Sequence, residues 1–491
     1  MRLPTAFGHP QNLSMNPAII AFALLLGGSL NLIAGAAAPI SAWPQFRGPD
    51  ASGVAAGDQP ALVEFGPGKN ERWNVAVPDG ASSPCIAGER IFLTAFTGGK
   101  LETICLNRAD GHVRWRKSIT PDKVEEVQKG CGSPASATPA TDGKQVYVYF
   151  SSFGVLAYDF DGREVWRHPL PLPFQEYGFG SGGSPVVCDG KVLLNRDADK
   201  DSELLALDAR AGKVAWRVAR PDFRMSWSTP AIWRHVGVTE VVLAGQLRVK
   251  AYDLKDGSER WLARGLPSAV CTTPVVGDGM LYLAAWSSGS GNEPMAFYAD
   301  SVAGLDANKD GKLSRDEIPA GRLKDFFDWV DTGHDGFITP EEYDGRVKAM
   351  RVGKNVIMAI RSGGRGDITE THVQWSQSKG VPYVPSPLLY RGKLFVVKDG
   401  GLASCFDAQT GKAFYLQERL DVGGDYYSSP VATDGKIYVA SLSGTVLVLK
   451  AGETFEVLAR NKFTAPISAT PAIVDGVTYV RTADHLYAFG R

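Results

Sequence analysis

The chain has 491 residues, with 52 Lys or Arg and 53 Asp or Glu, so its formal net charge at pH 7 is −1. This balance excludes a non-specific nucleic-acid binder, which needs a surface of one sign. A content of 44% hydrophobic and 21% charged residues excludes a disordered chain and a multi-pass membrane protein. The 55 glycines and 11 tryptophans are typical of an all-β chain with many turns.

Residues 1–42 predict a secretory signal peptide with cleavage near residues 36–42. Arg2 and His9 precede an apolar stretch from Ala18 to Ile33, and small residues follow it. This is the order of charged, apolar and small-residue regions in such a peptide. The alternative is an uncleaved membrane anchor, although glycines and polar residues interrupt the apolar stretch. We therefore expect a periplasmic or secreted protein with no membrane span after cleavage.

A phrase of Ser or Thr followed by Pro recurs along the chain and is followed each time by short apolar runs. The prolines are Pro84, Pro139, Pro185, Pro230, Pro274, Pro387, Pro430 and Pro471. They stand 41 to 55 residues apart, except for one step of 113 residues. Asp-Gly and Thr-Gly pairs between the apolar runs indicate β-hairpins. A period near 45 residues with four short strands is typical of a propeller blade.

The eight phrases predict an all-β, eight-bladed β-propeller over residues 43–491. The unit that begins at Pro471 lacks its fourth strand, whereas the segment around Trp73 has the pattern of that strand and follows no phrase. We therefore expect the N-terminal strand to complete the last blade and close the ring, which removes an exposed sheet edge. The alternative is two separate four-bladed units.

The long step predicts a small α-helical insertion in blade five, over residues 289–352. Within it, DANKDGKLSRDE matches the spacing of an EF-hand calcium loop at every ligand position. The predicted ligands are Asp306, Asn308, Asp310, the carbonyl of Lys312, Ser314 and Glu317. Calcium is a hard cation that takes oxygen ligands, and alternate residues of a tight loop can supply them.

A second loop, DTGHDGFITPEE, predicts a weaker calcium site. Its ligands are Asp331, Asp335, the carbonyl of Phe337, Thr339 and Glu342. Gly333 stands where the third ligand is expected, so one ligand is missing. Between the loops, an apolar helix face predicts a small core for the insertion; its residues are Leu323, Phe326, Phe327 and Val330. We expect structural calcium binding rather than calcium sensing.

Three segments resemble the pyrroloquinoline-quinone-type propeller repeat: ALDARAGKVAW at 206–216, AYDLKDGSERW at 251–261 and FDAQTGKAFY at 406–415. The segment WPQFRGPDASGV at 43–54 resembles the start of exported proteins of that superfamily. The resemblance implies the fold, with a Trp that caps the neighbouring blade. It implies no single activity, because the fold hosts both quinoprotein dehydrogenases and cofactor-free scaffolds such as the outer-membrane assembly lipoprotein.

The cysteines bear on a quinone cofactor. The resemblance implies a pair of adjacent cysteines for a dehydrogenase that uses pyrroloquinoline quinone, and the chain has no such pair. The six cysteines are Cys85, Cys105, Cys131, Cys188, Cys271 and Cys405. Since they map to different blades and radial positions, we expect mainly buried, free thiols.

Weaker signals are assigned to the scaffold. Asn195–Asp201 is expected to form a solvated hairpin tip, and the RGD tripeptide Arg365–Asp367 a turn between two strands. The segments that precede the Pro phrases, such as 130–137, 224–228 and 423–429, are expected to ring one end of the central channel. They either line a pocket or pack as tight inner turns.

These observations favour an exported, calcium-binding β-propeller without catalytic residues. We expect it to be a monomeric scaffold for an envelope or extracellular protein or glycan. The alternative is a quinoprotein oxidoreductase of the alcohol or sugar dehydrogenase type, with pyrroloquinoline quinone in the central channel.

Overall fold

A computed structural model describes residues 42–128, 130–175, 178–224, 226–288, 290, 296–325 and 327–491. The predicted signal peptide lies outside the described residues except for Ala42. Parts of the predicted insertion, residues 289, 291–295 and 326, also lie outside them.

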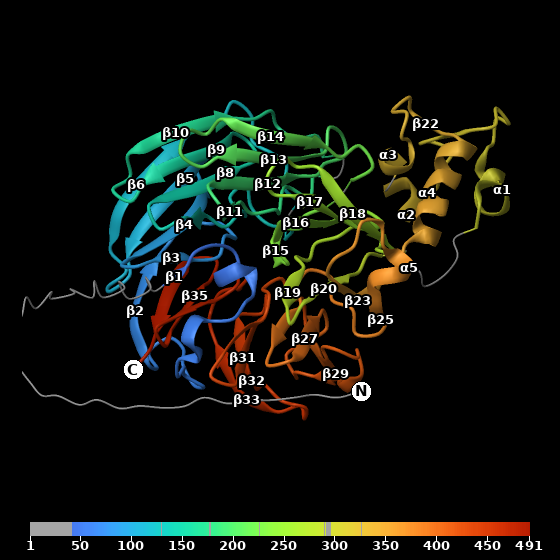
Figure 1. Cartoon of the computed structure of the whole chain (residues 1–491). Coiled ribbons are helices and arrows are strands. Elements are labelled where there is room, and N and C mark those ends of the chain that lie inside the picture. Colours follow the sequence, from blue (N-terminus) through green and yellow to red (C-terminus); the bar gives the residue numbers. More distant parts are fainter. Residues whose placement is uncertain are drawn as a thin grey trace, which may run out of the picture. The chain divides into compact units, whose positions relative to one another are not determined.

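The described residues form nine sheets. Eight of them, here called blades 1 to 8, are mainly antiparallel and follow one another in chain order around a centre (Figure 1); the ninth is a two-stranded sheet between blade 5's second and third strands. Blade 1 consists of β3 (Cys85–Ala87), β4 (Arg90–Thr97), β5 (Lys100–Asn107) and β6 (Val113–Ile119), and blade 2 of β7 (Ala140–Thr141), β8 (Gln145–Phe150), β9 (Gly154–Asp159) and β10 (Glu164–Pro169). Blade 3 consists of β11 (Val186–Cys188), β12 (Lys191–Arg196), β13 (Glu203–Asp208) and β14 (Val214–Ala219), and blade 4 of β15 (Ala231–His235), β16 (Val238–Gly245), β17 (Arg248–Asp253) and β18 (Glu259–Arg264).

Blades 5 to 8 follow the same order from the innermost to the outermost strand. Blade 5 consists of β19 (Val275–Gly277), β20 (Met280–Ala285), β23 (Val356–Arg361) and β25 (Val373–Gln377), and blade 6 of β26 (Leu388–Tyr390), β27 (Lys393–Lys398), β28 (Leu402–Asp407) and β29 (Ala413–Arg419). Blade 7 consists of β30 (Val431–Thr433), β31 (Lys436–Ala440), β32 (Thr445–Lys450) and β33 (Val457–Lys462), and blade 8 of β34 (Ala472–Val474), β35 (Val477–Arg481), β36 (His485–Phe489) and β2 (Glu71–Ala76). In blade 8, β2 pairs antiparallel with β36.

The Ser or Thr of each Pro phrase links its blade to the next. Proline holds the residue before it in an extended conformation, and the N–H of that residue donates to the hydroxyl of its counterpart one blade further on. The eight bonds, 2.9–3.1 Å long, run from Ser83 to Thr138, Thr138 to Ser184, Ser184 to Thr229, Thr229 to Thr273, Thr273 to Ser386, Ser386 to Ser429, Ser429 to Thr470 and Thr470 to Ser83. This hydroxyl ring confirms the eight-bladed propeller and excludes two separate four-bladed units.

A Trp of the outermost strand links neighbouring blades at a larger radius. The Trp ring covers a Gly of the next blade, and its Nε1–H donates to a carbonyl two or three residues before that Gly. The pairs are Trp73 with Gly111, Trp115 with Gly162, Trp166 with Gly212, Trp216 with Gly257 and Trp375 with Gly411. The repeated Trp of the sequence is therefore the outer connection between these blades.

Replacing Gly212 by alanine is expected to destabilise the protein. A Cβ atom at this position would lie 2.5 Å from the ring of Trp166. The loss should combine about 1–3 kcal/mol for overpacking with about 1–2 kcal/mol for the left-handed backbone. Gly190 is the matched control, because its φ is also positive but no atom lies within 4 Å of an added Cβ. Urea unfolding of the two variants measures the difference, and equal losses would contradict the packing role of Trp166.

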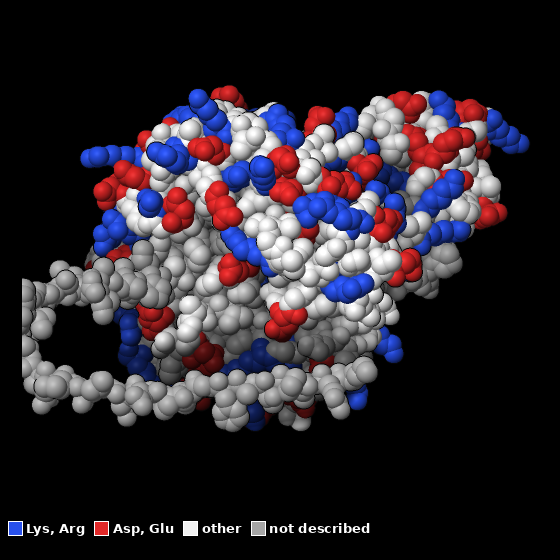
Figure 2. All heavy atoms as spheres, in the orientation of Figure 1, with Lys and Arg blue, Asp and Glu red and all other residues white. Residues whose placement is uncertain are grey.

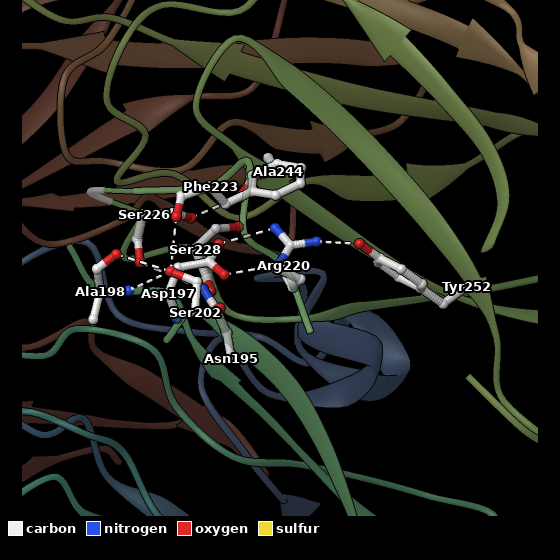
Figure 3. Close-up of polar contacts among 10 residues, drawn as sticks. All are labelled: Asn195, Asp197, Ala198, Ser202, Arg220, Phe223, Ser226, Ser228, Ala244 and Tyr252. Carbon is white, nitrogen blue, oxygen red and sulfur yellow. Dashed lines mark hydrogen bonds and ion pairs between the residues drawn. The ribbon is translucent and has the colours of Figure 1, made fainter. Parts of the chain in front are cut away.

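The predicted solvated tip at Asn195–Asp201 is wrong for its first four residues, which are buried. The side chains of Asp197 and Arg220 are both fully buried between blades 3 and 4, where they form a two-pronged ion pair of 2.7 and 2.9 Å (Figure 3). Nη1 of Arg220 also donates to the hydroxyl of Tyr252 in blade 4. The acidic run therefore includes a buried connection between blades.

The RGD tripeptide lies between two strands, as expected, but it is more than a turn. Gly366–Asp367 forms β24, which pairs in parallel with β18 of blade 4. The Asp367 carboxylate accepts bonds from Thr369 (2.6 Å) and Arg264 (2.9 Å), which lower its pKa to about 2. The tripeptide thus attaches blade 5 to the outer edge of blade 4.

The insert, defined here as residues 286–355, lies between β20 and β23 of blade 5. Its described elements are α1 (Tyr298–Ser301), η3 (Ala303–Leu305), β21 (Leu313–Ser314), α2 (Arg322–Asp325), α3 (Phe327–Val330), β22 (Phe337–Ile338) and α4 (Pro340–Val352). Leu323, Phe327 and Val330 belong to its own apolar core, as expected, while Phe326 lies outside the described residues.

Lys and Arg side chains alternate with Asp and Glu over the face that Figure 2 shows. No large area of one sign is visible on this face, in keeping with the balanced composition of the chain.

Candidate functional site

Glu317 closes the first predicted loop through hydrogen bonds to both of its ends. Its Oε1 accepts the N–H groups of Ala307 (3.0 Å) and Asn308 (3.3 Å). Its Oε2 accepts the N–H (2.9 Å) and the hydroxyl (2.8 Å) of Ser314. The twelfth loop residue therefore lies beside the second, third and ninth positions.

The remaining carboxylates of this loop bind its backbone. Asp306 accepts the N–H groups of Asp310 (3.2 Å) and Gly311 (2.9 Å), and Asp310 accepts that of Lys312 (3.1 Å). The Oδ1 of Asn308 accepts the N–H of Asp310 at 2.8 Å. These contacts hold the oxygen-bearing side chains along the inside of one tight turn.

The second predicted loop repeats the same contacts. Glu342 accepts the N–H (2.9 Å) and the hydroxyl (2.8 Å) of Thr339, as Glu317 does with Ser314. Asp331 accepts the N–H of Gly336 at 2.9 Å, as Asp306 does with Gly311. The carboxylate of Asp335 accepts the N–H of Phe337 at 3.0 Å. The missing ligand at Gly333 does not change the course of this loop.

A short antiparallel ladder joins the two loops. β21 pairs with β22, so that Leu313 lies opposite Ile338, and both side chains are fully buried. The Nζ of Lys312, the residue before β21, lies 3.4 Å from the ring centroid of Phe337 in β22. The predicted ligands thus belong to two equivalent loops with one shared core.

The two closing glutamates are held in the ionised form. Hydrogen bonds from Ser314 lower the pKa of Glu317. Burial raises the pKa of Glu342, but hydrogen bonds from Thr339 and Gly333 outweigh it, so that this pKa also lies below its usual value. Within the described residues, no three acidic, histidine or cysteine side chains gather as a metal site. Instead, the loop carboxylates face backbone N–H groups.

The central channel contains the N-terminal segment 42–56, which the repeat analysis did not place there. β1 (Ala42–Trp43) pairs with β3, and Val54 bridges to Ala432 of β30. The helical turn η1 (Pro49–Ala51) contacts β15, and Arg47 donates to the carbonyl of Pro387. Because the innermost strands of blades 1, 4 and 7 and the start of blade 6 all contact this segment, it fills the channel at their level. Trp43 and Arg47 are fully buried there.

One end of the channel, here called the mouth, is formed by the connections that lead into the innermost strands. Trp286 and Tyr383 meet there edge to face, with ring centroids 5.2 Å apart. All six cysteines are free and four are buried, as expected, but Cys131 is exposed and Cys271 is half-buried. Burial raises the pKa of Tyr383, and both thiols contribute to this increase. The sequence analysis placed segment 130–137, and with it Cys131, at one end of the channel, but it did not single out Tyr383 or Trp286.

No helix in the described part of the chain combines the length and the apolar character needed to cross a bilayer.

The sequence matches one protein family. Residues 49–179, 101–264 and 200–314 match the model of the family described as outer membrane protein assembly factor BamB. These overlapping matches span residues 49–314, which is more than half of the chain. No curated protein matches the chain in sequence.

Three solved structures illustrate the likeness in fold. BamB from Moraxella catarrhalis is 13% identical with a TM-score of 0.52, over 85% of this chain and 98% of that one. A europium-containing methanol dehydrogenase is 11% identical with a TM-score of 0.58, over 92% and 98%. Quinohemoprotein alcohol dehydrogenase from Comamonas testosteroni is 12% identical with a TM-score of 0.55, over 92% and 81%. At such identities the likeness concerns the fold alone.

Proposed function

We propose, because the chain belongs to the outer membrane protein assembly factor BamB family, that it is an exported, calcium-binding β-propeller that serves as an interaction scaffold. The protein acts as a monomer after removal of the signal peptide in residues 1–42, and its partner is an envelope or extracellular protein or glycan. It has no catalytic residues.

The observation that carries the scaffold proposal is the occupation of the channel by residues 42–56. A propeller enzyme needs open space for a cofactor and substrate at its centre, whereas here Trp43 and Arg47 fill the level of the innermost strands. Pyrroloquinoline quinone does not fit this chain, because adjacent cysteines are absent from the sequence and the channel is filled at this level. The alternative as a quinoprotein oxidoreductase is therefore the weaker one.

We assign the insert as an EF-hand pair. The donors Asp306, Asn308, Asp310, Ser314 and Glu317 offer oxygens, as does the carbonyl of Lys312, and calcium prefers oxygen ligands. The second loop offers Asp331, Asp335, Thr339 and Glu342 together with the carbonyl of Phe337. Calcium would replace the backbone N–H groups as the partner of these carboxylates and hold each loop closed.

The proposal also assigns β2 as the strand that closes the ring. Its support is the pairing of β2 with β36 and the position of Trp73 over Gly111 of blade 1. Blade 8 would thus be built from both ends of the mature chain.

Replacing Glu317 by glutamine is expected to abolish calcium binding to the first loop, because calcium loses its two-oxygen ligand. Calorimetry on the full chain should show a stronger and a weaker site, and only the stronger one should disappear. Glu341→Gln is the control, since Glu341 is an exposed neighbour of a predicted ligand but is not itself one. Unchanged binding in the Glu317 variant would refute the assignment.

A dye-reduction assay separates the scaffold from the enzyme. The protein is incubated with pyrroloquinoline quinone and calcium, and then with alcohols and sugars. We expect no substrate-dependent reduction. Reduction above that of the quinone alone would overturn the scaffold proposal. If there is none, affinity capture from an envelope fraction is the experiment that identifies the partner.

A further inference from the structure

The mouth of the channel gathers a set of side chains that the proposed function does not use. Cys131, Cys271, Tyr383 and Tyr427 lie on connections that lead into the innermost strands of blades 2, 5, 6 and 7. Trp286 follows β20 and Asp399 follows β27, and these second strands end at the same side of the ring as those connections. Topology therefore brings groups from four blades to one end of the ring.

One ring contact and one set of neighbours tie these groups together. The ring of Tyr383 contacts Trp286. Burial raises the pKa of Tyr383, and Cys271, Tyr427, Cys131 and Asp399 add to this increase. Burial likewise raises the pKa of Tyr427, with smaller contributions from both thiols, Asp425 and Asp399. One oxygen of Asp399 accepts the N–H of Tyr426 at 3.0 Å, which fixes the carboxylate at the edge of the group.

The groups of this cluster are aromatic, acidic or thiol groups, and none of them is basic. The cluster offers three aromatic rings, a carboxylate and two thiols. The charged groups that act on Tyr383, Tyr427 and Cys271 include no Lys or Arg. Asp399 has both an acidic and a basic neighbour, Asp425 and Lys398. The rings and Asp399 are half-buried, so they are partly shielded from water yet remain accessible. Aromatic faces beside a carboxylate attract organic cations, most strongly where water is partly excluded.

We propose that the channel mouth is a binding site for an organic cation, an ammonium or guanidinium group held by Trp286, Tyr383, Tyr427 and Asp399. Such a group can belong to a free amine or to a Lys or Arg side chain of a partner. The site extends the proposed scaffold function but does not depend on calcium, so the two proposals fail separately.

The test uses the rate of alkylation of Cys131, the exposed thiol at the mouth, followed by mass spectrometry on the full chain. Tetramethylammonium, N-acetyl-arginine amide and N-acetyl-lysine amide are the probes, and a neutral neopentyl alcohol is the control of similar shape. We expect the cations to slow alkylation and the alcohol to have no effect. Protection by the amino-acid amides at lower concentration indicates a partner side chain, whereas stronger protection by tetramethylammonium indicates a free amine.

Variants identify the groups that bind the cation. Tyr383→Ala and Asp399→Asn are each expected to weaken protection about tenfold, whereas Tyr383→Phe keeps the ring and should retain it. Asp421→Asn is the matched control, because it removes an exposed carboxylate that pairs with Arg460 on the outer surface. Saturation-transfer NMR with the same probes gives an independent affinity. Absence of protection by every cation, or equal protection in all variants, would overturn the proposal.

Discussion

Replacing Asp197 by asparagine is expected to lower the free energy of unfolding by about 3–5 kcal/mol, because the variant leaves Arg220 as a buried charge without its counter-charge. Burial alone would lower the pKa of Arg220, and the carboxylate of Asp197 is the main reason that it is raised instead. Figure 3 shows how Asn195, Ser202 and Ser226 surround this pair. Urea unfolding followed by tryptophan fluorescence measures the loss.

An exposed ion pair provides the control for this experiment. Asp161 lies 3.1 Å from Arg90 and its side chain is 78% exposed, so Asp161→Asn should change the stability by less than about 1 kcal/mol. The double variant Asp197→Asn/Arg220→Met should recover part of the loss, since it removes the unpaired charge. Equal losses at Asp197 and Asp161 would show that the buried pair contributes no more than a surface pair.

Replacing Trp73 by alanine is expected to cost about 3–5 kcal/mol in unfolding free energy and, in addition, to free the N-terminal strand. Trp73 is 9% exposed, lies over Gly111 and donates to the carbonyl of Arg108 in blade 1. Since β2 reaches blade 8 from the opposite end of the chain, loss of this contact weakens the closure of the ring. Limited proteolysis should then cut the chain between residues 43 and 71.

Trp216→Ala is the matched variant for this comparison. Trp216 contacts Gly257 in the same way and is 8% exposed, but its strand lies within a continuous part of the chain. Its loss of stability should be similar, without cleavage near the N-terminus. If protease cuts residues 43–71 to the same extent in both variants, β2 is not needed to close the ring.

The sequence was sufficient for the features that repeat. The Ser or Thr before each Pro has a structural role that recurs in every blade, so spacing alone located the blades. The Trp of the outermost strand and the core residues Phe327 and Val330 of the insert could likewise be predicted from sequence, because the residues that recur at a regular spacing are also the ones that pack against their neighbours.

Features that depend on contacts between distant segments could not be predicted. The run that contains Asp197 has a polar pattern typical of a loop. Its burial depends on Arg220, which follows β14 of the same blade, and on Tyr252 of blade 4. β24 is only two residues long, and its parallel partner β18 lies about a hundred residues earlier. The mouth cluster combines residues from four blades. The repeat placed the segments of Cys131 and Tyr427 at one end of the channel, but no local pattern connects them with Trp286 and Asp399, which follow second strands.

The hydroxyl ring and the outer Trp contacts have a consequence for how the molecule tolerates additions. The hydroxyl ring uses the start of each innermost strand, and the Trp contacts use the outermost strands. Neither connection uses the hairpin between the second and third strands of a blade. The insert occupies that hairpin in blade 5, and the hydroxyl ring is complete at Thr273 and Ser386 on either side of it. The same hairpin in the other blades therefore offers positions at which foreign domains could be grafted without opening the ring, except in blade 3, where it carries the buried Asp197.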